Sequence, residues 1–343
     1  MGAVMTLTPT SPSRSTYAEI ATKAGVSKAT VSRVLNGDER VHPDRTAAVI
    51  AAAEGLGYRP NRAARALSTG RTGLVAVVID DEPTALSDPF WGVVLAGISR
   101  VFLANDLHSL LMVTPLGSPD GAIAHYLEGG EVDGAIFLQV HKDEVIKKVA
   151  EQGLPVVLIG RPFDEDSDIP FVDNDNRGGG LQATKYLFDR GCKQVATLTG
   201  DLEATAGQDR LAGYKQAHIE AGREVNNDLV AQANWTFESA KIMTLRLLAK
   251  NPDIDGIFAA NDIMAIAAIA AIQERGRRVP DDIAVVGFDD SLLSQTHRPA
   301  ITTVRQDIIG LGVAAAETMI GLLQDHEPKI DVLATEIMIR ETA

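Results

Sequence analysis

Two hydrophobic patterns follow one another along the chain and change near residue 73. Before that point, apolar residues recur at the i, i+3, i+4 spacing of short amphipathic helices. From Leu74 onward, continuous β-branched apolar runs alternate with longer amphipathic stretches, which is typical of a parallel sheet covered by helices on both faces. The sequence therefore predicts a small all-α domain followed by a larger α/β core.

The stretch TYAEIATKAGVSKATVSRVLN, residues 16–36, predicts two helices joined by a tight turn. Thr16 is placed to cap the first helix, and Gly25 can take the left-handed conformation that ends it. Ser27 is placed to cap the second helix, which turns short polar and basic side chains outward. That geometry fits a DNA major groove, but an ordinary helical hairpin with a solvated face would show the same local pattern.

The segments that follow favour the first of these two interpretations. His42, Pro43 and Asp44 open a third helix, with the proline suited to its first turn, so three short helices can share one small core. The run 57–61 then breaks the chain, and a short helical candidate follows at 61–67. The apolar positions of the third helix are expected at Ala47, Val49, Ile50, Ala53 and Leu56.

The α/β part predicts two successive βα blocks of about equal size, 73–173 and 174–300, each large enough for its own core. Strands are expected at 74–79, 108–113, 134–138, 155–159, 194–199, 256–260, 283–287 and 332–340. Helices are expected at 90–105, 120–128, 143–152, 176–190, 208–221, 237–250, 262–275 and 308–323.

The charge is distributed unevenly between the two parts. The net charge is −14, yet residues 14–71 hold ten basic and five acidic residues, which leaves −19 for the rest of the chain. A basic head on an acidic body favours one oriented encounter with DNA.

Composition also bears on the compartment. Cys192 is the only cysteine, so no disulfide can form within one chain, which fits a reducing cytoplasm. The N-terminus has no pattern of a secretory signal, and its Thr, Pro and Ser content predicts a disordered arm. Because no run of about 18 apolar residues occurs, no membrane span is expected, and we expect a cytoplasmic protein.

Two runs of the sequence carry a family resemblance. AEIATKAGVSKATVSRVLNG and GYRPNRAARAL, both within residues 18–67, resemble the DNA-binding domain and hinge helix of the LacI/GalR family of bacterial transcription regulators. The resemblance extends over essentially all of residues 15–342. It implies a periplasmic-binding-protein-like core of two Rossmann-like subdomains, between which the chain crosses three times.

The resemblance and the patterns together predict the following domains. A disordered arm covers 1–14, a helix-turn-helix domain 15–60, and a hinge helix with its linker 61–72. The core, 73–343, binds an effector and dimerises. Its N-subdomain is expected at about 73–173 plus 304–328, and its C-subdomain at about 174–303 plus 329–343.

For DNA, the resemblance implies a homodimer on a near-palindromic operator. Lys28 and Ala29 match base-reading positions of the second helix, and Arg33 is long enough to reach a guanine edge. Leu67 matches a leucine that family members wedge into a central base step, beside a slim Ala64. No heptad tail follows Arg340, which favours a dimer but leaves a tetramer open. The expected DNA contacts are Thr16, Ser27, Lys28, Ala29, Thr30, Ser32, Arg33, Asn36, Arg59, Asn61, Arg62, Ala64 and Leu67.

An effector site is expected where strands of the core end. Ligands of open α/β sheets lie beyond the carboxyl ends of the strands, and a cleft between two subdomains is a natural pocket. Carboxylate, amide, guanidinium and aromatic side chains follow several predicted strands, and together they suit the hydroxyls and apolar face of a sugar. The expected contacts are Arg210, Asn261 and Asp289, which with Trp235 match effector positions of relatives, and also Phe90, Trp91 and Asp173.

Each of these residues has a structural alternative. Asp289 and Asn261 can cap the next turn or helix, and Arg210 can pair with Asp209 or Glu203 at the surface. Trp235 can belong to the core. For Phe90 and Trp91, we expect one ring to face the ligand and the other to pack its helix.

The sequence carries no enzyme motif. It has no GxxxxGK[ST] phosphate loop, no GxGxxG after a strand and no GxSxG nucleophile turn, and its seven histidines show no metal-ligand spacing. We therefore expect no enzymatic activity, metal or cofactor. The predicted function is a repressor of carbohydrate-utilisation genes that a small-molecule effector, expected to be a sugar, controls allosterically. The alternative is a sugar-binding protein of the solute-binding type without DNA regulation.

Overall fold

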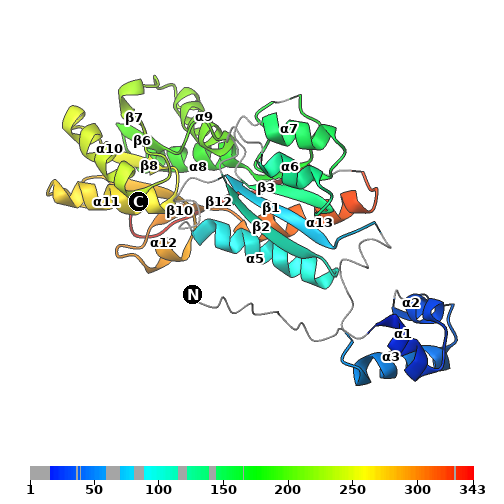
Figure 1. Ribbon diagram of the computed structural model, residues 1–343. Helices are drawn as coiled ribbons and strands as arrows, with labels where there is room; N and C mark the ends of the chain where they lie inside the picture. Colours follow the sequence, from blue (N-terminus) through cyan, green and yellow to red (C-terminus); the bar gives the residue numbers. More distant parts are fainter. Residues whose placement is uncertain are drawn as a thin grey trace, which may run out of the picture. The chain divides into compact units, whose positions relative to one another are not determined.

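The computed structural model describes residues 16–35, 38, 40–58, 70–80, 89–114, 122–138, 144–164, 166–327 and 330–343. The chain forms two compact units, Met1–Thr72 and Gly73–Ala343. Figure 1 labels their helices and strands in chain order. No helix within the described ranges is long and apolar enough to cross a membrane.

The described residues of the first unit form three short helices, α1 (Tyr17–Ala24), α2 (Lys28–Leu35) and α3 (Pro43–Gly55). Thr16 and Glu19 form a capping box at the start of α1, which satisfies N–H groups that the first turn leaves open. Gly25 ends α1 with a φ of 67°, a left-handed conformation that glycine takes without strain. The Thr30 N–H donates to Ser27 Oγ at 3.1 Å and so caps α2. The two predicted helices and their turn are confirmed.

One face of each helix builds the small core of this unit. Ile20, Val31 and Val49 are fully buried there. The prediction for α3 was wrong at two positions, because Ala47 is exposed and Ile50 is 46% exposed. The buried stripe of α3 instead runs through Val49, Ala52 and Ala53 to Leu56, and Ile50 lies about 100° around the helix from Val49.

The second unit contains two six-stranded sheets, one in each subdomain. Neighbouring strands are parallel in both sheets, with one exception: the last strand of the chain, β12, pairs antiparallel with β10. In the N-subdomain the order is β11 (Asp331–Leu333), β5 (Phe171–Asn174), β4 (Val156–Ile159), β3 (Gly134–Leu138), β1 (Leu74–Asp80) and β2 (His108–Thr114). In the C-subdomain it is β12 (Glu336–Met338), β10 (Thr302–Arg305), β9 (Ala284–Asp289), β8 (Gly256–Ala259), β6 (Val195–Thr199) and β7 (Val230–Gln232).

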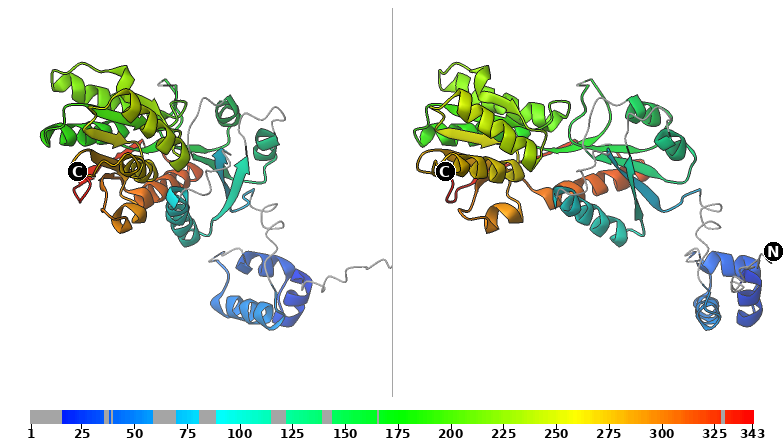
Figure 2. Two further views of the ribbon diagram at one scale, coloured as in Figure 1. Left: turned by 90° about the vertical axis from the view of Figure 1, so that its left-hand side faces the viewer. Right: turned by 60° about the vertical axis from the view of Figure 1, so that its left-hand side comes forward.

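Helices cover both faces of each sheet, so the strands read as continuous apolar runs (Figures 1 and 2). On the N-subdomain sheet, α5 (Pro89–Ala104) and α13 (Ile308–Leu323) pack on one face, and α6 (Ala122–Glu128) and α7 (Glu144–Glu151) on the other. On the C-subdomain sheet, α10 (Phe237–Lys250) and α11 (Asp262–Glu274) face α8 (Asn176–Asp189) and α9 (Thr205–Glu220) across the strands. The remaining helices are η2 (Asn227–Leu229) and α12 (Leu292–Thr296).

The chain crosses between the subdomains three times, between β5 and α8, between β10 and α13, and between β11 and β12. The prediction of one last strand at 332–340 was wrong, since this segment holds two short strands in different sheets. β11 lies in the N-subdomain sheet, so the expected assignment of 329–343 to the C-subdomain fails for that strand. β10 extends the C-subdomain sheet to Arg305, just beyond the expected boundary at 304.

Helices α8 and α9 touch through their backbones. A Cβ on Gly180 would lie 2.4 Å from the Arg210 carbonyl oxygen, and one on Gly213 would lie 2.1 Å from that of Arg177. Only glycine permits such an approach, because the atoms that a Cβ would meet belong to the backbone of the other helix and cannot move aside as a flexible side chain could. The contact fixes α9, and with it the Cα position of Arg210.

Candidate functional site

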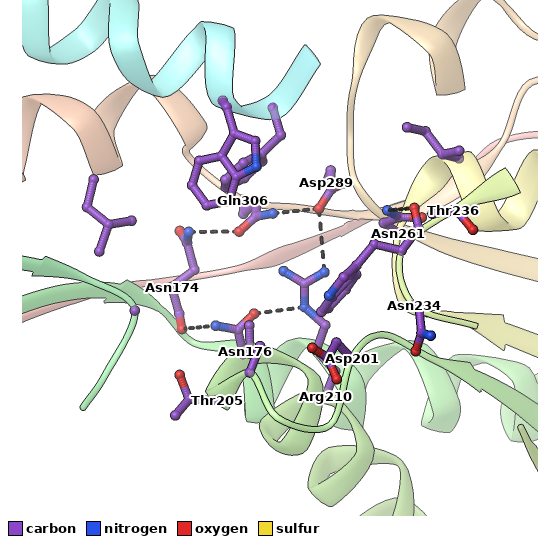
Figure 3. A pocket seen from close by; sticks show the side chains of 18 of the residues that line it. Asn174, Asn176, Asp201, Thr205, Arg210, Asn234, Thr236, Asn261, Asp289 and Gln306 are labelled. Atoms are coloured by element: carbon purple, nitrogen blue, oxygen red, sulfur yellow. Dashed lines mark hydrogen bonds and ion pairs between the residues drawn. The ribbon is translucent and has the colours of Figure 1, made fainter. Parts of the chain in front are cut away.

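A cavity of about 570 Å³ lies between the subdomains, at the carboxyl ends of strands from both sheets. Its position agrees with the rule for open α/β sheets. Figure 3 shows the polar side chains that converge in it. All seven predicted effector residues line this one cavity: Phe90, Trp91, Asp173, Arg210, Trp235, Asn261 and Asp289.

Arg210 lies at the centre of the polar wall and is buried. Its Nε donates to Asn176 Oδ1 at 2.8 Å, and its Nη1 donates to the Ala260 carbonyl. Nη1 also lies 3.6 Å from Asp289 Oδ1, and the guanidinium stacks 3.7 Å from the centre of the Phe288 ring. A surface pairing of Arg210 with Asp209 or Glu203, considered above as an alternative, is not among these contacts, and the side chain is buried.

Asp289 is the last residue of β9 and has a φ of 113°. Its Oδ1 accepts a hydrogen bond from Gln306 Nε2 at 2.6 Å. The capping of the next turn falls to Asp262 instead, whose Oδ2 accepts from the N–H and the hydroxyl of Ser291 at 2.8 Å each. Asp290 forms ion pairs away from the cavity, so only the first of the two adjacent carboxylates faces Arg210.

Asn261 caps a helix and also lines the cavity. Its Oδ1 accepts from the Met264 N–H at 2.8 Å and caps α11, while its Nδ2 donates to the Trp235 carbonyl at 3.2 Å. That bond holds the loop before α10, where Trp235 has a φ of 64°. The indole packs so closely over Gly200 that a Cβ there would lie 2.1 Å from the ring. Trp235 thus contacts the core and lines the cavity as well.

Asp173 lies on the opposite wall, in β5. Its Oδ1 accepts from the Asn174 N–H and from Asn176 Nδ2, both at 2.8 Å, and its Oδ2 accepts from the Arg161 N–H at 3.1 Å. Burial raises the pKa of Asp173 from 3.8 to about 6, although these hydrogen bonds and the nearby Arg210 charge oppose the shift.

Phe90 and Trp91 stand at the start of α5 with their ring centres 4.8 Å apart, edge to face. Both rings line the cavity and both pack on the N-subdomain core. The expectation that one would face the ligand and the other pack the helix was therefore wrong, because the T-shaped pair brings both to the cavity wall. An aromatic pair from the N-subdomain thus faces Trp235 and Phe237 of the C-subdomain.

Four amides of the cavity wall were not predicted: Asn234 in the loop before α10, and Asn174, Asn176 and Gln306 at the ends of β5 and β10. Asn174 Nδ2 donates to Gln306 Oε1 at 2.7 Å, and Asn176 connects Asp173 to Arg210. Figure 3 shows the resulting chain of hydrogen bonds from Asn174 through Gln306 to Asp289. Asn174, Asn176 and Gln306 lie at the carboxyl ends of β5 and β10. The periodicity predicted neither strand, so a search for polar residues at the ends of predicted strands could not find them.

In the first unit, α2 presents the predicted DNA-reading surface. Lys28, Ala29 and Arg33 are exposed on it, and Thr30 and Ser32 are half-buried. Ser27 Oγ lies 2.9 Å from Thr30 Oγ1 in addition to its capping bond. Thr16, at the start of α1, is exposed as well. The remaining predicted contacts lie outside the described residues: Asn36, Arg59, Asn61, Arg62, Ala64 and Leu67.

Comparison with known proteins places these features in one family. Residues 16–61 match the bacterial regulatory proteins of the lacI family, and residues 184–343 match the periplasmic binding protein-like domain. The transcriptional regulator CelR of Thermobifida fusca is 37% identical over 334 residues, which cover 96% of this chain and 98% of CelR. The chain belongs to the LacI family.

Solved structures agree with this assignment over the full length. A CelR–cellobiose complex is 35% identical, covers 96% of this chain and superposes with a TM-score of 0.77. The lac repressor dimer bound to operator and the anti-inducer ONPF is 25% identical, covers 96% of this chain and has a TM-score of 0.84.

The family membership confirms the predicted fold class, and it makes the chain a DNA-binding transcriptional regulator. Its relatives are regulators, which fits the expectation of a protein without enzymatic activity. Within the described ranges, His, Cys, Asp and Glu side chains form no cluster that could hold a metal ion.

Proposed function

We propose that this LacI-family protein represses carbohydrate-utilisation genes by binding a near-palindromic operator as a homodimer. In this proposal its effector is a neutral oligosaccharide of the cellobiose type, bound in the cleft between the subdomains. The observation that carries the proposal is the meeting of Arg210, Asp289, Asn261 and aromatic rings from both subdomains in one cavity.

The size and lining of the cavity support a ligand of two sugar rings. A volume of about 570 Å³ falls within the usual range for pockets that bury a drug-sized ligand, which is comparable in size to a disaccharide. Aromatic side chains on both sides offer faces for the apolar surfaces of two rings. The similarity to CelR, one structure of which holds cellobiose, points to the same class of ligand.

The charge of the cavity favours a neutral sugar over a phosphorylated one. The described lining residues include four carboxylates but only one guanidinium, Arg210, which already contacts Asp289. A phosphate would face this negative excess without an unshared cation among those residues. Hydroxyl groups, in contrast, can both donate to carboxylates and accept from amides.

Control of DNA binding would follow from the position of the effector. A sugar that contacts both walls changes the relative orientation of the subdomains, and a coupling free energy of about 1–3 kcal/mol would change operator affinity roughly 5- to 150-fold. The sugar acts either as an inducer, which lowers operator affinity, or as a corepressor, which raises it.

The test is operator selection with and without cellobiose. The protein is incubated with random duplex DNA, and we expect recovery of a near-palindrome whose yield changes when cellobiose is present. In parallel, cellobiose at about 100 times its dissociation constant should add about 2.7 kcal/mol to stability, seen as a higher melting temperature. Cellobiose phosphate is the matched control and should give no shift. No enriched DNA sequence under either condition would contradict the regulator, and no shift with cellobiose would contradict the sugar.

A further inference from the structure

An ion pair joins the two subdomains beside the cavity. Arg161 follows β4 of the N-subdomain, and Asp209 lies in α9 of the C-subdomain. Arg161 Nε donates to Asp209 Oδ2 at 2.6 Å, and Nη2 donates to Oδ1 at 2.9 Å, so the pair is bidentate. The two side chains are only 27% and 19% exposed. Bidentate, charge-assisted hydrogen bonds of this kind are stronger than those between neutral groups.

The backbone of Arg161 contacts both walls of the cavity as well. Its N–H donates to Asp173 Oδ2 at 3.1 Å, and its carbonyl accepts from Thr205 Oγ1 at 3.1 Å. Asp173 and Thr205 line the cavity from opposite subdomains. Asp209 is, moreover, the chain neighbour of Arg210, the central side chain of the site. Arg161 therefore connects Asp173 of one cavity wall to Thr205 of the other, and so helps to fix the distance between the two walls.

The location of this pair distinguishes it from the other ion pairs. Lys147 and Asp164 belong to the N-subdomain alone, and Lys185 and Glu220 to the C-subdomain alone. Of the ion pairs whose two partners are both described within residues 73–343, only Arg161–Asp209 connects the N-subdomain to the C-subdomain.

We propose that Arg161 is a positioning residue for the effector site and that its ion pair with Asp209 latches the two subdomains in the arrangement that binds the effector. The proposal deepens the proposed function and rests on it for the identity of the ligand. Loss of either partner removes the bidentate ion pair that joins the subdomains, which favours a wider separation of the subdomains. The population of the binding-competent arrangement then decreases, and the apparent affinity for the sugar falls with it.

The first experiment measures the separation of the subdomains without any ligand. Spin labels are attached to Glu151→Cys in α7 and Lys215→Cys in α9, both exposed positions. The native Cys192 is buried, and burial raises its thiol pKa to about 11, so it stays unlabelled. We expect Arg161→Gln and Asp209→Asn to shift and broaden the distance distribution. Distances identical to those of the parent in both variants would overturn the latch.

Two further variants separate the latch from a general effect of charge or stability. Lys185→Gln removes the same charge from a pair within the C-subdomain and should leave the distances unchanged. The charge-swapped protein, Arg161→Asp with Asp209→Arg, should restore the parent distribution at least in part. If Arg161→Gln fails to fold, Asp209→Asn and Arg161→Lys take its place, and a broadened distribution in Asp209→Asn with a smaller change in Arg161→Lys supports the latch.

The second experiment titrates cellobiose against the same proteins by calorimetry. Each single variant should bind about 5- to 50-fold more weakly than the parent, within the usual range of coupling between sites. Lys185→Gln should bind as the parent does. If the parent does not bind cellobiose, the proposed sugar fails, while the distances measured without ligand still decide whether the latch exists.

Discussion

The guanidinium of Arg210 is held in place before any ligand arrives. Asn176 and the Ala260 carbonyl accept its hydrogen bonds, the Phe288 ring stacks on it, and Asp289 balances its charge. Such pre-organisation lowers the entropy lost when a ligand binds, because the side chain has few other conformations to give up. The polar wall of the cavity is therefore rigid, and selectivity depends on where the ligand places its hydroxyls.

Asp289→Asn tests this wall with minimal change of shape. The amide oxygen can still accept from Gln306, and asparagine tolerates a positive φ, but the charge opposite Arg210 is lost. Because hydrogen bonds to charged groups contribute about 1.5–3 kcal/mol, we expect sugar affinity to fall about 10- to 100-fold in calorimetry. Asp325→Asn, at an exposed residue with a φ of 58°, is the control and should change nothing. Parent-like affinity of Asp289→Asn would remove this residue from the site.

Asp173 makes the stability of the core depend on pH in an unusual direction. Burial raises the pKa of Asp173 and of Asp262 from 3.8 to about 6, so the folded protein holds more protons than the unfolded chain between these values. Stability should therefore fall as pH rises from about 4 to about 6. The loss for each carboxyl is at most about 1.4 kcal/mol per pH unit.

Urea unfolding of the parent and of Asp173→Asn at several pH values within this window checks the sign. The variant should lose less stability than the parent over the same range, with the remaining fall due to Asp262. Carboxylates with lowered pKa, such as Asp38 and Asp282 at about 2, titrate below the window and act alike in both proteins. Parallel curves for the two proteins would show that Asp173 titrates normally.

Residues near the carboxyl end of a predicted strand were more predictable than residues near a strand that the sequence did not predict. Arg210, Asn261 and Asp289 were found because chemistry at the carboxyl ends of strands and the family resemblance pointed to the same positions. The Arg161–Asp209 pair joins residues 48 apart in sequence, across two subdomains whose mutual orientation no hydrophobic period encodes. Asn174 and Gln306 were missed because their strands, FVDN and TTVR, are at least half polar, whereas the equally short β8, GIFA, reads as an apolar run.

At the scale of elements, the helix-turn-helix was the most predictable part. Capping residues, a glycine with a positive φ and a helical period all indicated the same boundaries, and all three agree with the structure. The end of the chain was the least predictable. Its strands β11 and β12 have three residues each and lie in different sheets, and the mostly apolar segment, interrupted at Thr335 and Glu336, gave no clear sign of the crossing between them.

Leu67→Ala tests the predicted hinge helix at 61–67, which lies outside the described residues. A helix of about two turns is unstable alone in water, so the hinge should fold only on DNA, with Leu67 wedged into a base step. We expect a loss of operator affinity of about 10-fold or more in a DNA titration, with unchanged sugar binding. Ile219→Ala, at a side chain 71% exposed on α9, serves as the control. Equal operator affinity of the Leu67→Ala protein and the parent would exclude the wedge.

For the molecule as a whole, charge and architecture serve different steps. The basic residues concentrated at 14–71 are attracted to DNA phosphates, whereas the acidic core discourages other parts of the surface from binding them. The core contributes a cavity whose two walls belong to separate sheets. Because three crossing segments and local side-chain contacts join the walls, small changes at the cavity can alter the orientation of whole subdomains.

The backbone contact between α8 and α9 limits how this regulator can be redirected to a new effector by laboratory evolution. Substitution of Gly180 or Gly213 would displace α9 and move Arg210 away from its partners, so a library at these positions would yield mostly inactive proteins. Diversity introduced at Phe90, Trp91 and Trp235 would instead alter the surface of the cavity while the helices keep their places. A biosensor for a different ligand is best sought among variants at these three cavity-lining positions.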